Sequence, residues 1–184
     1  MIQRRATLDD LYQVEGPAEL VNGRIVADMT GERPGEVAEN IFVSLRAHAK
    51  KLGRGKAHGD GVGYIARVEA SGRESFCPDA SYHTRPPGAN PLRFIEGAPD
   101  FAVEVRSEND YGPAAEAELA AKRTDYFAAG TLVVWDVDPV NETVAAYRAA
   151  DPSQPRVFRG TETADAEPAV PGWRIALDEV FAQG

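Results

Sequence analysis

The segment at residues 100–106 (DFAVEVR) constrains the fold of this 184-residue chain more than any other segment. Its side chains alternate, with Phe101, Val103 and Val105 on one side of an extended backbone and Ala102 and Glu104 on the other. Alternation with a period of two residues is typical of a β-strand that packs in a sheet. The chain must therefore build a sheet that carries one carboxylate, Glu104, among valines.

Two helices are predicted around this strand. Residues 34–52 repeat apolar side chains near the helical period and end at Gly53, while residues 113–129 begin with a proline and end at Gly130. A shorter helix follows Thr7, which is a good N-cap residue in front of two acids.

The remaining strands are predicted from apolar runs and turn residues. Asn22-Gly23 between two apolar runs is a strong hairpin signal, because both central residues of the turn need a positive φ. Residues 53–63 are interpreted as a Gly-rich loop and residues 150–172 as a polar, Pro-rich segment. Further strands are expected at residues 62–68, 76–82, 131–137 and 143–147, with Pro78 at an edge or bulge. Residues 173–181 are expected to carry a last short strand and a turn.

This order of elements predicts an α/β fold, with a central mixed β-sheet flanked by helices. A chain of about 100–200 residues usually makes one domain, so residues 1–184 are expected to form a single domain with a core at about residues 7–182.

Composition and charge exclude several classes of protein. The longest apolar run, residues 131–135, is far too short to cross a membrane, and the single cysteine, Cys77, fits a reducing cytoplasm. The net charge of -9 argues against a protein that coats nucleic acid by bulk charge. Residues 46–73, however, carry a net charge of +5, which could contact phosphates or could simply be a solvated helix end and loop.

Three charged residues lie where the pattern predicts burial. Asp79 lies in an apolar strand and Glu104 lies between valines, so each carboxylate needs a cation or a neutral form. Lys122 shares one face of the helix with Leu119 and Tyr126.

Two interpretations of this trio are open. Lys122 can extend to solvent or make a structural ion pair with Glu104. Alternatively, the two carboxylates hold Mg²⁺ and the lysine stabilises an attacking hydroxide, which is the chemistry of phosphodiester hydrolysis. His83 is expected to be a lone exposed side chain, although it could face such a site, and Asp136 and Asp138 are expected to cap a turn.

Short motifs along the chain resemble a known nuclease family. Pro78-Asp79 followed by Glu104-Val105-Arg106 resembles the PD-(D/E)XK signature, with Arg106 where that signature usually has lysine. The wider chain resembles the Uma-type family of restriction endonucleases in that superfamily. The matching stretches are ELVNGRIV (19–26), CPDASY (77–82), PDFAVEVRS (99–107), AKRTDYFAAGTLVVWDVDP (121–139) and VPGWRIALDEVF (170–181).

The resemblance implies a restriction-endonuclease-like fold and a set of catalytic residues. It implies that the catalytic lysine has moved to the helix, at Lys122, and that Glu19 joins the site as an accessory acid. Asp79 and Glu104 would then be the catalytic carboxylates that bind Mg²⁺ or Mn²⁺, with help from the Val105 carbonyl. The chain departs from the family pattern at Gly35-Glu36, where a histidine is common, and after Ser107. These two departures concern residues that would contact substrate, not the residues that would bind the metal.

The sequence therefore favours a cytoplasmic, metal-dependent endonuclease that hydrolyses DNA phosphodiester bonds. By analogy with small nucleases of this fold, it is expected to act as a homodimer. The alternatives are a catalytically inactive, dimeric binding or regulatory module on the same fold, and a metal hydrolase acting on a small phosphorylated substrate. The net charge of -9 and Arg106 at the usual lysine position favour the inactive module.

Overall fold

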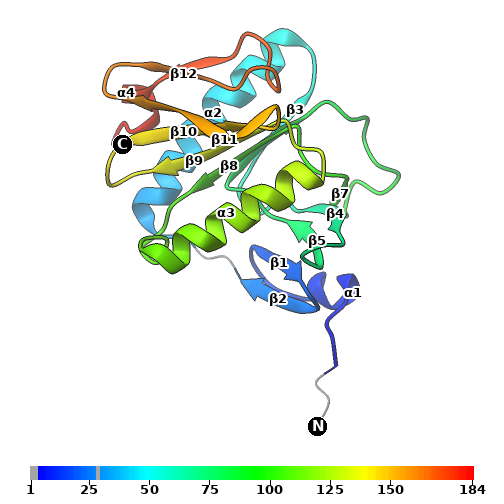
Figure 1. The fold of residues 1–184 in the computed structure, drawn as a ribbon. Helices are drawn as coiled ribbons and strands as arrows, with labels where there is room; N and C mark the ends of the chain where they lie inside the picture. Colours follow the sequence, from blue (N-terminus) through cyan, green and yellow to red (C-terminus); the bar gives the residue numbers. More distant parts are fainter. Residues whose placement is uncertain (1–3, 28–29) are drawn as a thin grey trace.

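The protein has two large β-sheets and a third sheet of only two strands, residues 163–165 and 174–176, in a computed structural model that describes residues 4–27 and 30–184 (Figure 1). The strands are β1 (Ala18–Val21), β2 (Arg24–Ala27), β3 (Lys56–Gly59), β4 (Tyr64–Val68), β5 (Arg73–Phe76), β6 (Ala80–His83), β7 (Ile95–Glu96), β8 (Phe101–Val105), β9 (Val133–Asp138), β10 (Thr143–Arg148), β11 (Asp151–Arg159), β12 (Thr163–Asp165) and β13 (Arg174–Ala176). The helices are α1 (Leu8–Leu11), α2 (Glu32–Leu52), α3 (Pro113–Ala128) and α4 (Leu177–Val180).

The larger sheet has the strand order β11-β10-β9-β8-β6-β3, and the second sheet has the order β2-β1-β5-β4-β7. The pairs β8–β9 and β4–β7 are parallel and their neighbours are antiparallel, so the predicted mixed sheet and α/β fold are confirmed. The second sheet was not predicted. Within the part of the chain that the structure describes, no helix is long and apolar enough to cross a membrane.

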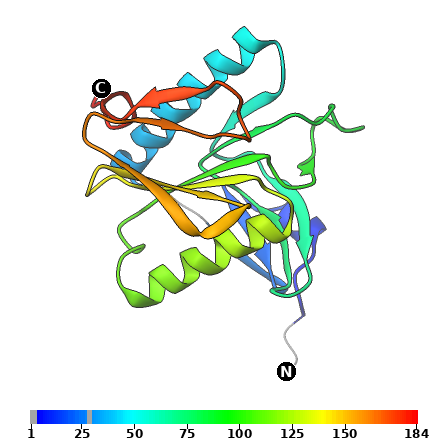
Figure 2. The ribbon, with the colours of Figure 1, turned by 45° about the horizontal axis from the view of Figure 1, so that its top comes forward.

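The alternation predicted for β8 decides which helix covers which face of the larger sheet. Phe101, Val103 and Val105 pack in one core with the apolar stripe of α2, whereas Ala102 packs with Tyr126 of α3 in another core. Figures 1 and 2 show α2 and α3 on opposite faces of this sheet. Glu104 follows the parity of Ala102 and therefore faces α3.

Local turn chemistry is confirmed at the hairpin and at the helix ends. Asn22 and Gly23 have φ values of 49° and 72°, as the turn between β1 and β2 requires. Gly53 ends α2 in the left-handed conformation at φ 65°. Thr7 and Asp10 form a capping box at the start of α1.

The predicted strand at residues 76–82 is wrong, because the chain changes sheet there. Phe76 ends β5 in the second sheet and Ala80 begins β6 in the larger one. Between them, the Cys77 N–H donates to a side chain and Pro78 has no N–H, so a ladder cannot continue across this step. The step places Asp79 at the start of β6, where its N–H donates to the Val103 carbonyl.

Edge strands account for the other differences from the prediction. The expected loop at residues 53–63 contains β3, and the polar segment at residues 150–172 contains β11 and β12. β3 and β11 are the two edges of the larger sheet, where polar side chains and prolines are tolerated because one side of the strand makes no ladder. At the end of the chain, the short strand expected within residues 173–181 is β13, and the helix α4 follows it where a turn was expected.

His83 is buried rather than exposed, because it pairs with a second histidine. The Nε2 atoms of His58 in β3 and His83 in β6 lie 3.3 Å apart, and the two rings are inclined by 9°. His83 is only 3% exposed. Burial, together with the charges of His58 and Arg85, lowers the pKa of His83 to about 4. Burial and the charge of Lys56 also lower the pKa of His58.

We expect the stability of the fold to decrease as the pH falls from about 6.5 toward 4. Below pH 6.5 the unfolded chain binds a proton at His83 that the folded chain does not bind, so acid favours unfolding. One proton contributes at most about 1.4 kcal/mol per pH unit, or about 2 kcal/mol between pH 6.5 and 5. Urea unfolding of the wild type and of His83→Gln at pH 7, 6 and 5 tests this. The variant should show the shallower decrease, and parallel curves for the two proteins would contradict it.

Candidate active site

A pocket of about 430 Å³ lies at the end of β8, between α3 and the β1–β2 hairpin. Its charged lining residues come from segments that are far apart in the sequence. They are Glu19, Arg73, Asp79, Glu104, Asp110, Glu118, Lys122 and Asp125. Each of the sequence-predicted site residues Glu19, Asp79, Glu104, Val105 and Lys122 lines this pocket.

Glu104 and Lys122 form the centre of the site. The Lys122 Nζ donates to the Glu104 Oε2 at 2.7 Å, and the Tyr126 hydroxyl donates to the Glu104 Oε1 at 2.6 Å. Lys122 and Tyr126 are four residues apart, so one face of α3 supplies both donors. Burial raises the pKa of Glu104 to about 7, because Lys122 offsets only part of the burial and the charge of Glu19 adds to it.

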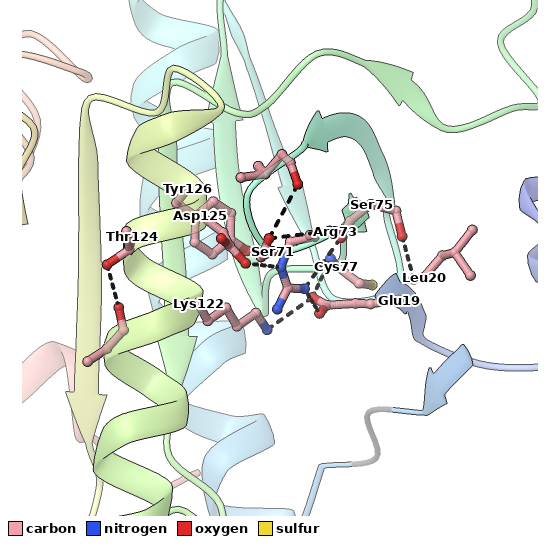
Figure 3. Close-up of polar contacts among 12 residues, drawn as sticks. Glu19, Leu20, Ser71, Arg73, Ser75, Cys77, Lys122, Thr124, Asp125 and Tyr126 are labelled. Atoms are coloured by element: carbon pink, nitrogen blue, oxygen red, sulfur yellow. Dashed lines mark hydrogen bonds and ion pairs between the residues drawn. The ribbon is translucent and has the colours of Figure 1, made fainter. Parts of the chain in front are cut away.

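Glu19 binds the same lysine from the other sheet. Its Oε1 lies 3.0 Å from the Lys122 Nζ and accepts the Cys77 N–H at 2.9 Å, while its Oε2 pairs with Arg73. Figure 3 shows Lys122 reaching from α3 toward Glu19 at the edge of the hairpin. Burial opposes ionisation of Glu19, but Lys122 and Arg73 more than offset it and lower its pKa.

Arg73 and Asp125 belong to this network, although the sequence analysis did not identify them. The Arg73 Nε donates to the Asp125 Oδ2 at 2.9 Å, and Arg73 is 8% exposed (Figure 3). Arg73 was counted as part of a basic surface, because the turn before β5 was not recognised. Asp125 gave one usable signal, since it lies three residues after Lys122 and can share its side of the helix.

Asp79 approaches from the step between the two sheets. Its Oδ2 accepts the Val105 N–H at 2.6 Å, and the residue is 9% exposed. This contact places the Asp79 carboxylate beside the backbone of Val105, one residue after Glu104. The buried acids predicted to share one site therefore line one pocket.

The donor set of the pocket fits a hard divalent cation. The carboxylates of Asp79, Glu104, Glu19 and Asp125 line it against only two cations, Lys122 and Arg73. Oxygen ligands suit Mg²⁺, which usually keeps several waters and needs only one or two carboxylates. Within residues 4–27 and 30–184, no group of three or more His, Cys, Asp or Glu side chains is arranged to hold a metal ion by itself.

Arg106, at the usual position of the signature lysine, does not line this pocket. Its Nε and Nη2 donate to Asp136 at 2.7 and 2.9 Å, and its guanidinium also pairs with Glu116. Asp136 was predicted to cap a turn, and this prediction is wrong because the residue pairs with both Arg106 and Arg123. Asp138 does cap the turn, by accepting the N–H groups of Val140 and Asn141.

The sequence matches a known protein family over most of its length. Residues 6–178 match the Uma2 family, which is described as "Putative restriction endonuclease". The chain belongs to this family. No curated protein matches the sequence.

Among solved structures, the Uma2 chain is similar to "a putative nuclease belonging to DUF820" from Anabaena variabilis ATCC 29413. The two share 19% sequence identity with a TM-score of 0.71, over 95% of this chain and 97% of the other. At this identity the match shows that the two proteins have the same fold.

We expect Arg73→Met to destabilise this Uma2 protein by about 3–5 kcal/mol, because Asp125 stays buried without its arginine partner and Glu19 keeps only Lys122. The double variant Arg73→Met/Asp125→Asn should recover part of this loss. Arg67→Met is the matched control, since Arg67 is exposed and its pair with Glu74 should contribute less than about 1 kcal/mol. Urea unfolding measures all three, and equal effects of the Arg73 and Arg67 changes would contradict the prediction.

Proposed function

We propose that this protein is a metal-dependent endonuclease that hydrolyses DNA phosphodiester bonds. The observation that carries the proposal is the Lys122 ammonium, which lies 2.7 Å from Glu104 and 3.0 Å from Glu19 in a pocket that Asp79 also lines. Membership of a family described as restriction endonucleases supports the same reaction. Asp79, Glu104 and the Val105 carbonyl would hold Mg²⁺, with Mn²⁺ as a substitute.

The residues of the pocket can be given distinct roles. Glu19 and Glu104 fix the Lys122 ammonium from two sides, so its charge is held in place before the substrate enters. There Lys122 would stabilise the hydroxide that attacks phosphorus and the negative charge that develops on the phosphoryl oxygens. A bound divalent ion would lower the pKa of a water and neutralise phosphate charge. The P–O bond to the departing sugar oxygen then breaks, and that oxygen takes up, through solvent, the proton that the attacking water has released.

Tyr126 and Arg73 are positioning residues in this scheme. Tyr126 donates to the Glu104 oxygen that Lys122 does not contact, so it restricts the rotation of that carboxylate. Arg73 holds Glu19 and in turn is held by Asp125, so the two groups that contact Lys122 are each fixed by a further partner. Such preorganisation reduces the reorganisation needed when charge develops in the transition state.

A second candidate is a binding or regulatory module without activity, and one observation favours it. Arg106 replaces the usual signature lysine, and its ion pairs with Asp136 and Glu116 keep it out of the pocket. The same observation fits an enzyme whose lysine is supplied by α3. The two candidates differ in one measurable property, which is cleavage of DNA in the presence of a divalent ion.

We expect wild-type protein to cut plasmid DNA with Mg²⁺ or Mn²⁺ and to be inactive in EDTA. Lys122→Met should reduce the cleavage rate by about 10²-fold or more, which is typical for loss of a group that stabilises transition-state charge. Asp79→Asn should lose cleavage together with Mn²⁺ affinity, whereas Lys122→Met should keep or increase Mn²⁺ affinity because a repelling charge is removed. Gel analysis of plasmid nicking and calorimetric Mn²⁺ titration measure the two effects.

Urea unfolding of each variant and a Lys51→Ala variant, which changes an exposed lysine at the end of α2, provide the controls. If Lys122 serves only as a structural ion pair, its replacement lowers stability while the folded fraction cuts DNA at the wild-type rate. That result would end the catalytic assignment. Inactivity of the wild type with both metals would instead favour the binding module.

We also propose that two copies associate, because one pocket holds one set of reacting groups and cutting a duplex requires attack on both strands. Sedimentation equilibrium should therefore give twice the chain mass of 19.8 kDa at micromolar concentration, with or without DNA. A monomer in both conditions would contradict this expectation.

A further inference from the structure

A groove runs along α2 on the side that faces β3, outside the pocket described above. Its lining residues on the helix recur every three or four positions, from Gly35 through Glu39, Phe42 and Arg46 to Lys50. β3, at the edge of the larger sheet, forms the other wall. The groove has two sections, of about 310 Å³ near the start of the helix and about 550 Å³ near its end.

The charge of the groove changes along its length. The section near the end of α2 is lined by Arg46, Lys50 and Lys56, and no carboxylate is among its described lining residues. The section near the start of α2 is lined by Glu39, Asp60 and Asp79. A polyanion would therefore be attracted to the far section, although the protein as a whole carries a charge of -9.

An aromatic ring lies where the two sections meet. Phe42 lines both of them, and so does Gly59 of β3. A Cβ at Gly59 would lie 3.3 Å from the Phe42 ring, so the glycine keeps this part of the groove open beside the aromatic side chain. The Arg46 guanidinium lies 5.7 Å from the centre of the same ring. A half-buried aromatic next to basic residues is a typical surface for stacking an unpaired base.

The groove leads to the candidate active site. Asp79 lines both the near section of the groove and the pocket that contains Lys122. The register explains this continuity, because Gly59 at the end of β3 pairs with Ala80, the residue after Asp79. β3 has four residues, so its basic end at Lys56 lies about 10 Å along the strand from this point.

A groove of about 580 Å³ beside α1 does not combine these features, because it mixes Arg67 and Arg93 with Asp9, Glu74 and Glu96. In the α2–β3 groove a half-buried aromatic ring lies beside a basic wall. This combination suits a single strand, whose phosphates follow the basic wall and whose unpaired bases can reach the ring.

We propose that the α2–β3 groove binds a single strand of the DNA substrate next to the cleavage point, with phosphates on Arg46, Lys50 and Lys56 and a base on Phe42. This inference rests on the proposed function for the identity of the substrate, but the binding that it describes does not require catalysis. Residues 46–73 are basic for two different reasons in this view. Arg46, Lys50 and Lys56 contact phosphates, whereas Arg73 is an internal partner of Glu19 and Asp125.

Fluorescence anisotropy with a fluorescein-labelled single-stranded 20-nucleotide DNA in EDTA tests the groove without cleavage. Arg46→Glu/Lys50→Glu should bind at least 10-fold more weakly than wild type. It should also reduce the slope of log K against log salt by about 1.4, the value for two lost contacts to a single strand. Phe42→Ala should weaken binding by about 5-fold or more, with an unchanged salt slope.

Arg156→Glu/Arg159→Glu is the matched control. It changes the net charge by the same amount on β11, at the opposite edge of the sheet from β3. Urea unfolding and circular dichroism confirm that each variant is folded. The proposal is overturned if the two double variants weaken binding equally, since bulk charge would then explain the effect, or if neither weakens it.

The two proposals fail in distinguishable ways. If groove variants lose DNA binding in EDTA while wild-type protein cuts no plasmid, the groove stands and the nuclease assignment fails. If wild-type protein cuts plasmid but the groove variants bind single-stranded DNA as it does, the groove assignment alone fails.

Discussion

The contact of one lysine with two buried carboxylates holds the candidate site together. Lys122 belongs to α3, Glu104 to the larger sheet and Glu19 to the second sheet, so a single ammonium joins three parts of the fold. Buried charges are unfavourable unless they are paired, and each of the two carboxylates has a further partner. Tyr126 donates to Glu104, and Arg73 pairs with Glu19. The geometry of the pocket is therefore coupled to the packing of α3 between the two sheets.

The step from β5 to β6 supplies the remaining acid. Cys77 uses its N–H for Glu19, Pro78 has none, and Asp79 uses its carboxylate for the N–H of Val105. Three successive residues thus connect Glu19 to the end of β8, and the last of them, Asp79, also donates its N–H to the Val103 carbonyl. This arrangement supplies the oxygen donors that the proposed nuclease needs, and it places the α2–β3 groove beside them.

Charge in this protein is separated by position. Several carboxylates line the candidate active site, where a divalent cation would offset their charge. The basic residues Arg46, Lys50 and Lys56 line a separate section of the α2–β3 groove, near the end of α2. Because the Debye length is about 8–10 Å at physiological salt, a phosphate beside Arg46, Lys50 and Lys56 is largely screened from most of the acidic surface. An acidic chain can in this way present a local surface for DNA, as the proposed function requires.

The sequence by itself determined the features that depend on neighbouring residues. The alternation of residues 100–106, the turn at Asn22-Gly23 and the stop at Gly53 depend on local backbone geometry, and the structure confirms them. Asp79, Glu104 and Lys122 were also identifiable, because a charge in an apolar pattern is visible in the sequence, whereas Glu19 was identified only through the family resemblance. The Lys122–Glu104 pair was one of the expected outcomes, but the pairs of Arg73 with Glu19 and Asp125 were not visible.

Only the tertiary structure decided the pairings, the second sheet and the edge strands. Arg73 is 54 positions from Glu19 and 52 from Asp125, so no local pattern connects them. β3 and β11 lack a clear apolar alternation, since one side of an edge strand faces solvent. Residues 76–82 read as one strand, yet they divide between two sheets, because hydrogen bonds to distant side chains compete with the local preference for an extended ladder.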